Sequence, residues 1–390
     1  LYNAGHLIEA AVAYYRATNE KKLLDVSIKF VQNIMDNFGE GKIEGADGHQ
    51  EVELALVKLY QLTQDKKYLD LSRYFIDVRG KNPEFYNEQK RALNQEPFTN
   101  LDYLQAYDLP INQKEAKGHA VRMLYMMEAM ADLAYYQNDA KMESAVKTLW
   151  DDIINTKMYI TGGVGQTVQG EAFAQSYELT NDTMYGETCA AIGMVNTAKR
   201  LFKLEQDDAI IDTMERSLYN GMLAGMSQDG EHFFYVNPLE YIKDRYSPDK
   251  GHVKGERPEW LGCACCPPNI ARTIASIDSY FYSKVDNDLY IHMYGDAKYE
   301  DENITIIQTS AFPSQDNHQF EIQIKNDAST LHFRKPNWSD NLKITLDGKI
   351  IPEKITLEPG NYQIHVAIDN EPFALYTTSE VVHNANKVAF

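Results

Sequence analysis

Residues 48–70, GHQEVELALVKLYQLTQDKKYLD, decide the fold of this chain because they contain one complete helical hairpin. A Gly-His pair opens the stretch, and the apolar residues Val52, Leu56 and Leu59 follow at helical spacing. A short polar turn then leads into a second segment of the same period. The pattern predicts two consecutive helices joined by a tight turn.

The same pattern recurs at three other places in the chain. Each copy has a glycine, a polar residue, an apolar helix, a short polar turn and a second helix. The copies are GHLIEAAVAYYRATNEKKLLD at 5–25, GHAVRMLYMMEAMADLAYYQNDAKM at 118–142 and GETCAAIGMVNTAKRLFKLEQDDAIID at 186–212. Divergent hairpins at intervals of roughly 40 to 70 residues predict an α-solenoid or a closed ring of hairpins.

The hydrophobic period changes from helical to alternating at about residue 286. Leu289, Ile291 and Met293 occupy every second position, which is typical of a strand with one buried face. Asp347-Gly348 is a hairpin turn signal between two further alternating runs. The period change predicts an antiparallel β domain after the helical one.

We therefore expect a mainly α chain with a helical domain over residues 1–285 and a β domain over residues 286–390. With 390 residues and 44% hydrophobic composition, the chain can bury two cores. It opens with LYNAGHLIEAAVAYY, without an initiator methionine, and it ends with NKVAF. We interpret it as a fragment that is incomplete at both ends, with a truncated β domain.

The charge of the chain narrows the classes of partner. Lys and Arg number 38 against 57 Asp and Glu, which gives a net charge of −19. Such a surface repels nucleic acid and anionic membranes and suits neutral or cationic partners. The sequence has no apolar run long enough to span a bilayer, which takes about 18 residues or more.

Equivalent positions of the hairpins carry chemically active residues. His6, His49, His119 and Glu187 each follow the glycine at the start of a first helix. The cysteines of CACCPPN (263–269) also precede a helix, because proline is tolerated in a first helical turn. Helix N-termini carry partial positive charge and favour thiolates and carboxylates. In a ring of hairpins these residues would line one common mouth.

Three of the four cysteines, Cys263, Cys265 and Cys266, lie within four positions. This crowding leaves three interpretations: a metal site, a disulfide or unligated core thiols. We favour a metal site, because thiolates suit zinc and Cys189 with Glu187 complete a set of four ligands with Cys265 and Cys266. Structural zinc usually takes C-x-x-C pairs, so adjacent cysteines and a carboxylate favour a reactive site over a structural one.

Single residues carry less weight than the cluster. A lone Gly-His at a helix start is more often a structural histidine than a ligand. Glu171, in the glycine-rich stretch GGVGQTVQGEAF, would by itself be interpreted as solvated surface. The 26 tyrosines fit carbohydrate platforms and ordinary core packing almost equally well.

Taken together, the motifs resemble the β-L-arabinofuranosidase family of glycoside hydrolases, family 127, with its relative family 146. The motifs are GGVG, GEAF, YELTNDTMYGETCA, FFYVNPLE and WLGCACCPPNIAR, in that order, and the resemblance covers essentially the whole chain. It implies an (α/α)6 barrel followed by β-sandwich domains, and a retaining, exo-acting glycosidase with a zinc-bound cysteine nucleophile.

The resemblance also implies a role for each matching residue. It assigns zinc to Glu187, Cys189, Cys265 and Cys266, with Cys265 as the nucleophile. It makes Glu171 the general acid/base, and it does not make Cys263 a ligand. His6, His49, His119 and Tyr235 match residues that line the sugar pocket.

We therefore expect a hydrolase of terminal β-L-arabinofuranosides from plant glycans, with a carbohydrate partner and a homodimer as one option for its assembly. The alternatives are a sister glycosidase for another, pectic sugar and a non-catalytic carbohydrate-binding protein with a structural zinc. An isomerase or epimerase on the same barrel would not need the thiolates. Reduced, metal-bound thiols favour a bacterial cytoplasm over a periplasm.

Overall fold

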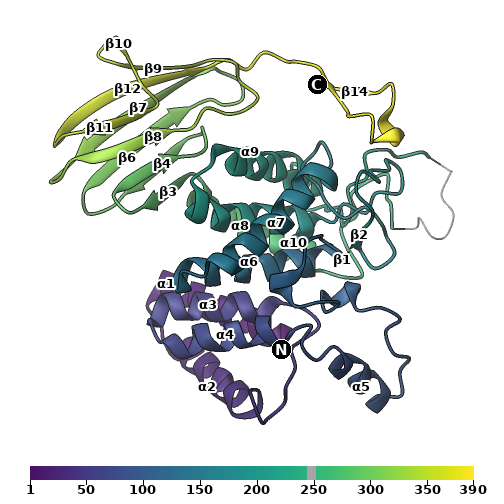
Figure 1. The fold of residues 1–390 in the computed structure, drawn as a ribbon. Helices are drawn as coiled ribbons and strands as arrows, with labels where there is room; N and C mark the ends of the chain where they lie inside the picture. Colours follow the sequence, from purple (N-terminus) through teal and green to yellow (C-terminus); the bar gives the residue numbers. More distant parts are fainter. Residues whose placement is uncertain (244–251) are drawn as a thin grey trace.

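The computed structural model describes residues 1–243 and 252–390 (Figure 1). The helices are α1 (Tyr2–Thr18), α2 (Lys22–Asn37), α3 (Glu51–Thr63), α4 (Lys66–Val78), α5 (Glu84–Ala92), α6 (Ala120–Gln137), α7 (Ala140–Thr156), α8 (Thr188–Glu205), α9 (Asp208–Arg216) and α10 (Cys266–Ile274). Shorter helical turns are η1 (Asp102–Leu104), η2 (Pro110–Asn112), η3 (Ser217–Met222, π-helical), η4 (Leu223–Gly225), η6 (Ile277–Tyr280) and η7 (Val382–Asn384).

The four predicted hairpins are α1–α2, α3–α4, α6–α7 and α8–α9, and each turns in the same way. The first helix of each ends in a left-handed residue, namely Asn19, Gln64, Asn138 or Gln206. In three of the hairpins, an aspartate then caps the second helix, as Asp139 does by accepting hydrogen bonds from the backbone N–H groups of Lys141 and Met142. This turn chemistry explains why divergent sequences give one supersecondary unit.

The first helices of the hairpins form an inner ring, and the second helices lie outside it. α1 packs on α3, α3 on α6, α6 on α8 and α8 on α10. Arg272 of α10 contacts Glu9 of α1 at 2.7 Å, so the two ends of this series meet. Ring helices such as α6 and α8 are buried over most of their length. The predicted ring of hairpins is therefore confirmed as an α/α barrel.

The β domain is a sandwich of two sheets at one end of the barrel (Figure 1). Its six-stranded sheet has the order β10-β9-β12-β7-β6-β5, and its four-stranded sheet has the order β11-β8-β4-β3. The strands are β3 (Tyr282–Val285), β4 (Asp288–Ile291), β5 (Ala297–Glu300), β6 (Ile304–Ser310), β7 (Asn317–Ile324), β8 (Ser329–Phe333), β9 (Leu342–Leu346), β10 (Lys349–Ile351), β11 (Lys354–Leu357) and β12 (Gly360–Ile368).

The structure refines two details of the predicted β domain. The sheets are antiparallel except for one pair, β4 and β8, whose strands run parallel. β3 begins at Tyr282, a few residues before the predicted domain boundary between residues 285 and 286. The position of that domain boundary stays a prediction. The alternation at Leu289, Ile291 and Met293 gives three buried side chains, as expected.

The final residues leave the sandwich and return to the barrel. The paired strands β13 (Leu375–Tyr376) and β14 (Val388–Ala389) lie beside the loops of the helical domain, where Asn181 Nδ2 donates a hydrogen bond to the backbone oxygen of His383 at 3.2 Å. A buried ion pair also joins the domains, because Arg334 contacts Glu215 of α9 at 2.8 Å. Among the described residues, no helix combines the length and the apolar character needed to span a membrane.

Candidate active site and metal centre

The N-terminal ends of the five inner helices meet around one cavity of about 490 Å³. These ends carry His, Glu and Cys side chains where three of the outer helices carry capping aspartates: His119, Glu187 and Cys265 are the N-cap residues of α6, α8 and α10. His6 is the fifth residue of α1, and His49 lies just before α3. The cavity is lined by Tyr2, His6, His49, His119, Val121, Tyr125, Glu171, Glu187, Cys189, Tyr235, Cys263, Ala264, Cys265, Pro268, Asn269 and Arg272.

One side of the cavity is a cluster of three thiols and a carboxylate. Cys189 Sγ lies 3.5 Å from Cys266 Sγ, and Cys265 Sγ lies 3.8 Å from Cys266 Sγ. Glu187 Oε1 lies 3.5 Å from Cys265 Sγ and 4.0 Å from Cys266 Sγ. A tetrahedral zinc with its usual bond lengths separates its ligand atoms by roughly 3.5–3.8 Å. The spacing and chemistry of the four residues therefore fit a tetrahedral metal ion.

The surroundings of the cluster support this fit. All four cysteines are free, so no disulfide competes for the sulfur atoms. Glu187 is 3% exposed, and its Oε2 has no hydrogen-bond partner among the described groups, which is costly for a buried carboxyl oxygen. Burial and the neighbouring Cys265 and Glu171 raise the pKa of Glu187. Hydrogen bonds donated by Cys189 and Cys266 lower the pKa of the Cys265 thiol.

The fourth cysteine, Cys263, lies beside this cluster and outside it. Its Sγ is 3.8 Å from Cys265 Sγ and 4.0 Å from the hydroxyl of Tyr235, and the residue is exposed. Among the described residues, the group of thiols that could hold a metal ion comprises Cys189, Cys265 and Cys266 together with Glu187, and Cys263 is not part of it.

Glu171 faces the cluster from the loop that follows α7. The two-residue strands β1 (Gly118–His119) and β2 (Ala172–Phe173) pair, and the backbone N–H of Ala120 donates to the oxygen of Glu171 at 2.9 Å. Glu171 itself has a left-handed φ of 51°, an uncommon conformation that needs support from its surroundings. Gly118 is required here, because a Cβ at this position would lie 1.8 Å from the backbone oxygen of Asp102.

The pairing of β1 with β2 brings Glu171 against a histidine and the cluster. His119 Nε2 lies 3.1 Å from Glu171 Oε2, and one ligand atom from each of His119, Glu171 and Glu187 lies within 4.8 Å of the others. Burial raises the pKa of Glu171, but the hydrogen bond and charge of His119 outweigh it, so the pKa is lowered.

The other two histidines have different surroundings. His6 Nδ1 lies 3.0 Å from Glu51 Oε1 and 3.7 Å from Glu9 Oε2. Burial and the charge of Arg122 lower the pKa of His49 well below its ordinary value, and its Nδ1 has no hydrogen-bond partner among the described residues. Burial also raises the pKa of Tyr235, whose ring packs against Tyr185.

The sequence-based reasoning missed four residues that bring polar groups to the cavity: Tyr2, Tyr125, Asn269 and Arg272. Asn269 and Arg272 follow Cys265 at i+4 and i+7 on α10, so helical spacing could have placed them on the cysteine face. Tyr2 and Tyr125 lack such a signal, because an aromatic residue in an inner helix is equally compatible with the core.

Comparison with known proteins places this site in a family. Residues 1–279 match the model of the β-L-arabinofuranosidase GH127 catalytic domain, and residues 288–367 match that of the GH127 middle domain. A non-reducing end β-L-arabinofuranosidase of Bifidobacterium longum subsp. longum is 41% identical over 378 residues, which is 92% of this chain.

Two solved structures share the fold over the whole chain. A GH127 β-L-arabinofuranosidase from Geobacillus stearothermophilus T6 has 41% identity and a TM-score of 0.95. A second GH127 β-arabinofuranosidase has 34% identity and a TM-score of 0.85. The present chain spans 57% of the Bifidobacterium relative and 65% and 62% of the two solved chains. The chain thus belongs to glycoside hydrolase family 127, the family expected from its motifs, and it has that family's helical barrel followed by a β domain.

Proposed function

We propose that this protein is a retaining exo-glycosidase that hydrolyses terminal β-L-arabinofuranosides, with Cys265 as its nucleophile and Glu171 as its acid/base. The observation that carries the proposal is the placement of a thiol and a carboxyl in one cavity, next to the shared neighbour Glu187. Cys265 Sγ is 3.5 Å from Glu187 Oε1, and Glu171 lies within 4.8 Å of the same residue. The family relatives named as arabinofuranosidases support the choice of sugar.

Glu187, Cys189, Cys265 and Cys266 would hold a zinc ion, because their number, chemistry and spacing match its usual site. Zinc, when bound, would keep the thiols ionised at neutral pH, where a free thiol is only a few per cent thiolate. A carboxylate at one of the four positions donates less charge than a thiolate would. We infer that Glu187 tunes the charge on Cys265 and thereby its reactivity.

The reaction takes two steps at the anomeric carbon. In the first, the Cys265 thiolate forms a C–S bond to this carbon while the glycosidic C–O bond breaks, and Glu171 gives its proton to the departing oxygen. In the second, Glu171 takes a proton from water, whose oxygen attacks the same carbon and breaks the C–S bond. Two displacements retain the configuration of the sugar.

The lowered pKa of Glu171 suits the second of these two reaction steps, and the first step requires that the pKa rise when substrate binds. The carboxylate is the form that the second step needs, so the free site is set for hydrolysis of the intermediate. The first step needs the acid form. The Glu171 side chain is 34% exposed in the free site. We expect bound sugar to exclude water from this carboxyl and so to raise its pKa.

His6, His49, His119 and Tyr235 line the cavity and would hold the sugar hydroxyls. The partner is a plant-derived arabinoside, with no role for nucleic acid in so acidic a chain. A homodimer remains one option for the assembly.

The test is hydrolysis of 4-nitrophenyl β-L-arabinofuranoside by the purified protein and by Cys265→Ser, Glu171→Gln and Cys263→Ser variants, with zinc measured in each. We expect Glu171→Gln to lose about 10²–10⁴-fold in kcat/KM with its zinc retained, because removal of an acid/base has effects of this size. Cys265→Ser should lose at least as much, whereas Cys263→Ser should resemble the wild type.

The outcomes separate the alternatives. Undiminished activity in Cys265→Ser would show that the crowded cysteines serve structure. Full zinc with no hydrolysis of the arabinoside would favour a sister specificity, to be sought with glycosides of pectic sugars. Zinc with no hydrolysis of any glycoside would favour a binding protein with a structural metal.

A further inference from the structure

Two carboxyl groups, those of Glu9 and Glu51, lie beside the Nδ1 atom of His6. Glu51 of α3 approaches His6 Nδ1 to 3.0 Å, and Glu9 of α1 approaches the same nitrogen to 3.7 Å. The His6 side chain is 37% exposed and lines the sugar cavity, whereas Glu51 is fully buried. The sequence motifs single out His6 and do not point to either carboxylate.

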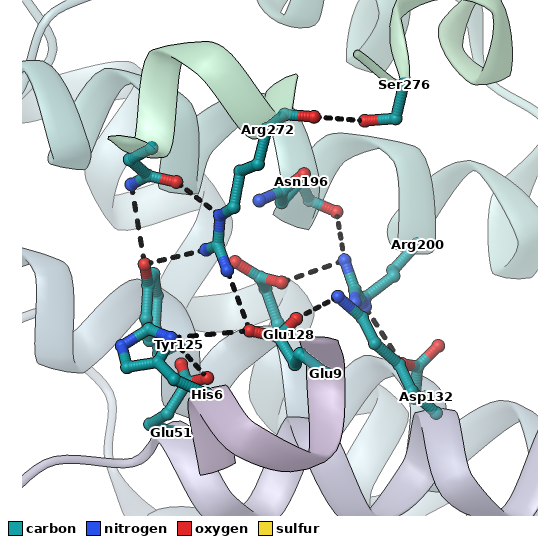
Figure 2. A network of polar contacts seen from close by, with 12 residues as sticks. His6, Glu9, Glu51, Tyr125, Glu128, Asp132, Asn196, Arg200, Arg272 and Ser276 are labelled. Carbon is teal, nitrogen blue, oxygen red and sulfur yellow. Dashed lines mark hydrogen bonds and ion pairs between the residues drawn. The ribbon is translucent and has the colours of Figure 1, made fainter. Parts of the chain in front are cut away.

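Glu9 is already engaged by two cations. Arg272 Nη1 of α10 lies 2.7 Å from Glu9 Oε2 (Figure 2). Lys58 Nζ of α3 pairs with Glu9 Oε1. The charges of Lys58 and Arg272 outweigh burial and lower the pKa of Glu9 well below its ordinary value. Glu9 therefore serves mainly to join α1 to α3 and α10.

Glu51 has no comparable support. Over residues 1–243 and 252–390, His6 is the one cationic group that forms an ion pair with Glu51, and neither carboxyl oxygen has a hydrogen bond from another described group. Burial and the charge of Glu9 raise the pKa of Glu51 well above its ordinary value, and the hydrogen bond and charge of His6 oppose this rise. Gly5 makes the close approach between α1 and α3 possible, because a Cβ there would lie 2.5 Å from Glu51 Cγ. The packing is thus arranged around the contact of Glu51 with His6.

This contact fixes both the orientation and the protonation of the His6 ring. The ring is held edge-on to Tyr2, with 4.6 Å between the ring centroids, and Nδ1 is directed at the carboxylates. The remaining nitrogen, Nε2, is left for the cavity. Burial alone would lower the pKa of His6, but its hydrogen bonds to Glu51 and Glu9 raise the pKa to about 9. At neutral pH both ring nitrogens then carry a proton, so Nε2 donates and does not accept.

We propose that Glu51 is a positioning residue for substrate binding, which holds the ring and the proton of His6 so that Nε2–H donates a hydrogen bond to an oxygen of the bound sugar. The proposal rests on the proposed function of the cavity and deepens it. The charged and titratable groups that face His6 are Tyr2 and Glu9 from α1, Glu51 from α3 and Arg272 from α10. Loss of the Glu51 carboxyl would leave Glu9, more distant and already paired, as the remaining partner of His6 Nδ1.

The test compares Glu51→Gln and Glu51→Asp with the wild type, and uses Glu53→Gln as the matched control. Glu53 is also fully buried on α3, but it pairs with Arg79 at 3.2 Å and does not line the cavity. The titration of His6 is followed by NMR of histidine-labelled protein, with the signal assigned from a His6→Gln variant. Kinetics on 4-nitrophenyl β-L-arabinofuranoside are measured at pH 5.5 and pH 8.

We expect Glu51→Gln to move the pKa of His6 down toward the ordinary value of about 6.5. KM at pH 8 should rise about tenfold, the usual effect of losing one hydrogen bond from a charged donor, with a smaller change at pH 5.5 and in kcat. Glu51→Asp should restore part of the shift, and Glu53→Gln should leave it unchanged.

An unchanged His6 titration in Glu51→Gln would overturn the proposal, as would a KM increase that is equal at both pH values and is matched by Glu53→Gln. If no variant and no wild type hydrolyses the arabinoside, the proposed function fails. The NMR titration still decides whether Glu51 controls His6.

Discussion

Two walls of the same cavity are built on the same backbone feature and differ in their charge balance. The thiol wall comprises Glu187, Cys189, Cys265 and Cys266, and the histidine wall comprises His6, His49 and His119. Both lie at N-terminal ends of inner helices, where the backbone favours negative charge. In the histidine wall, glutamate side chains meet histidine nitrogens at 3.0–3.1 Å, Glu51 at His6 and Glu171 at His119.

The thiol wall has no such internal balance. Among the described residues, no Lys, Arg or His nitrogen forms an ion pair with Glu187, and the thiols hydrogen-bond to one another and to Glu187. This difference indicates that the negative charge of each wall is balanced in its own way. The histidine wall is balanced by its own side chains, and the thiol wall, we infer, by a bound cation.

The strongest way to break this comparison is to remove one thiol. We expect Cys189→Ala to lose bound zinc and at least about 100-fold in kcat/KM, because even loss of an outer partner of a metal ligand costs about 10–100-fold. Cys189 is 3% exposed and Cys263 is exposed, so Cys263→Ala is the control that removes a nearby thiol outside the cluster. Metal analysis of the two variants gives the answer, and full zinc in Cys189→Ala would contradict the assignment of the thiol wall.

A subtler change keeps the metal and alters its ligands. In Glu187→Cys, four thiolates would hold zinc more tightly and donate more charge to it than three thiolates and a carboxylate do. We expect the variant to retain zinc against a chelator for longer than the wild type, and to hydrolyse the arabinoside about 10–100-fold more slowly. Unchanged turnover would show that the carboxylate ligand does not tune the reactivity of Cys265.

The sequence was sufficient to predict the ring of hairpins and the meeting of His6, His49 and His119 in one cavity. Glycine followed by histidine or glutamate recurs at a fixed place in each hairpin, and a ring brings equivalent places together. This is why His6, His49 and His119 could be assigned to one cavity without knowledge of any contact. Repetition carries the information, because each Gly-His pair alone is ambiguous.

The sequence was insufficient where a contact depends on loops or on one close approach. Glu171 meets His119 because β1 pairs with β2 across the long stretch between them, and no local pattern predicts that two-residue pairing. Glu51 follows the second Gly-His pair and looks like an ordinary first-turn carboxylate, which helices favour. Its contact with His6 depends on the absence of a side chain at Gly5. The parallel pairing of β4 with β8 is similarly invisible in an alternating pattern.

The smallest expected effect is on the pH dependence of stability, where His6 and His49 of the histidine wall should act in opposite directions. His6 has a pKa raised to about 9, so its contribution to stability is complete below the unfolded value of about 6.5 and is lost as pH rises through about 9. His49 has the opposite sign: its pKa is lowered by burial and by Arg122, so its neutral form stabilises the fold above about pH 6.5. As pH falls below that value, protonation of His49 favours unfolding.

Thermal unfolding of the wild type and of His49→Gln should therefore diverge on acidification. Between pH 7.5 and pH 5.5 we expect the wild type to lose about 2 °C more in Tm than His49→Gln, because a glutamine cannot take up the proton. The His6→Gln variant is the counterpart, and its deficit relative to the wild type should shrink as pH rises from 7.5 to 9.5. Parallel curves for all three proteins would mean that neither histidine has a pKa shifted by folding, and that the histidine wall is not divided between a charged donor and a neutral ring.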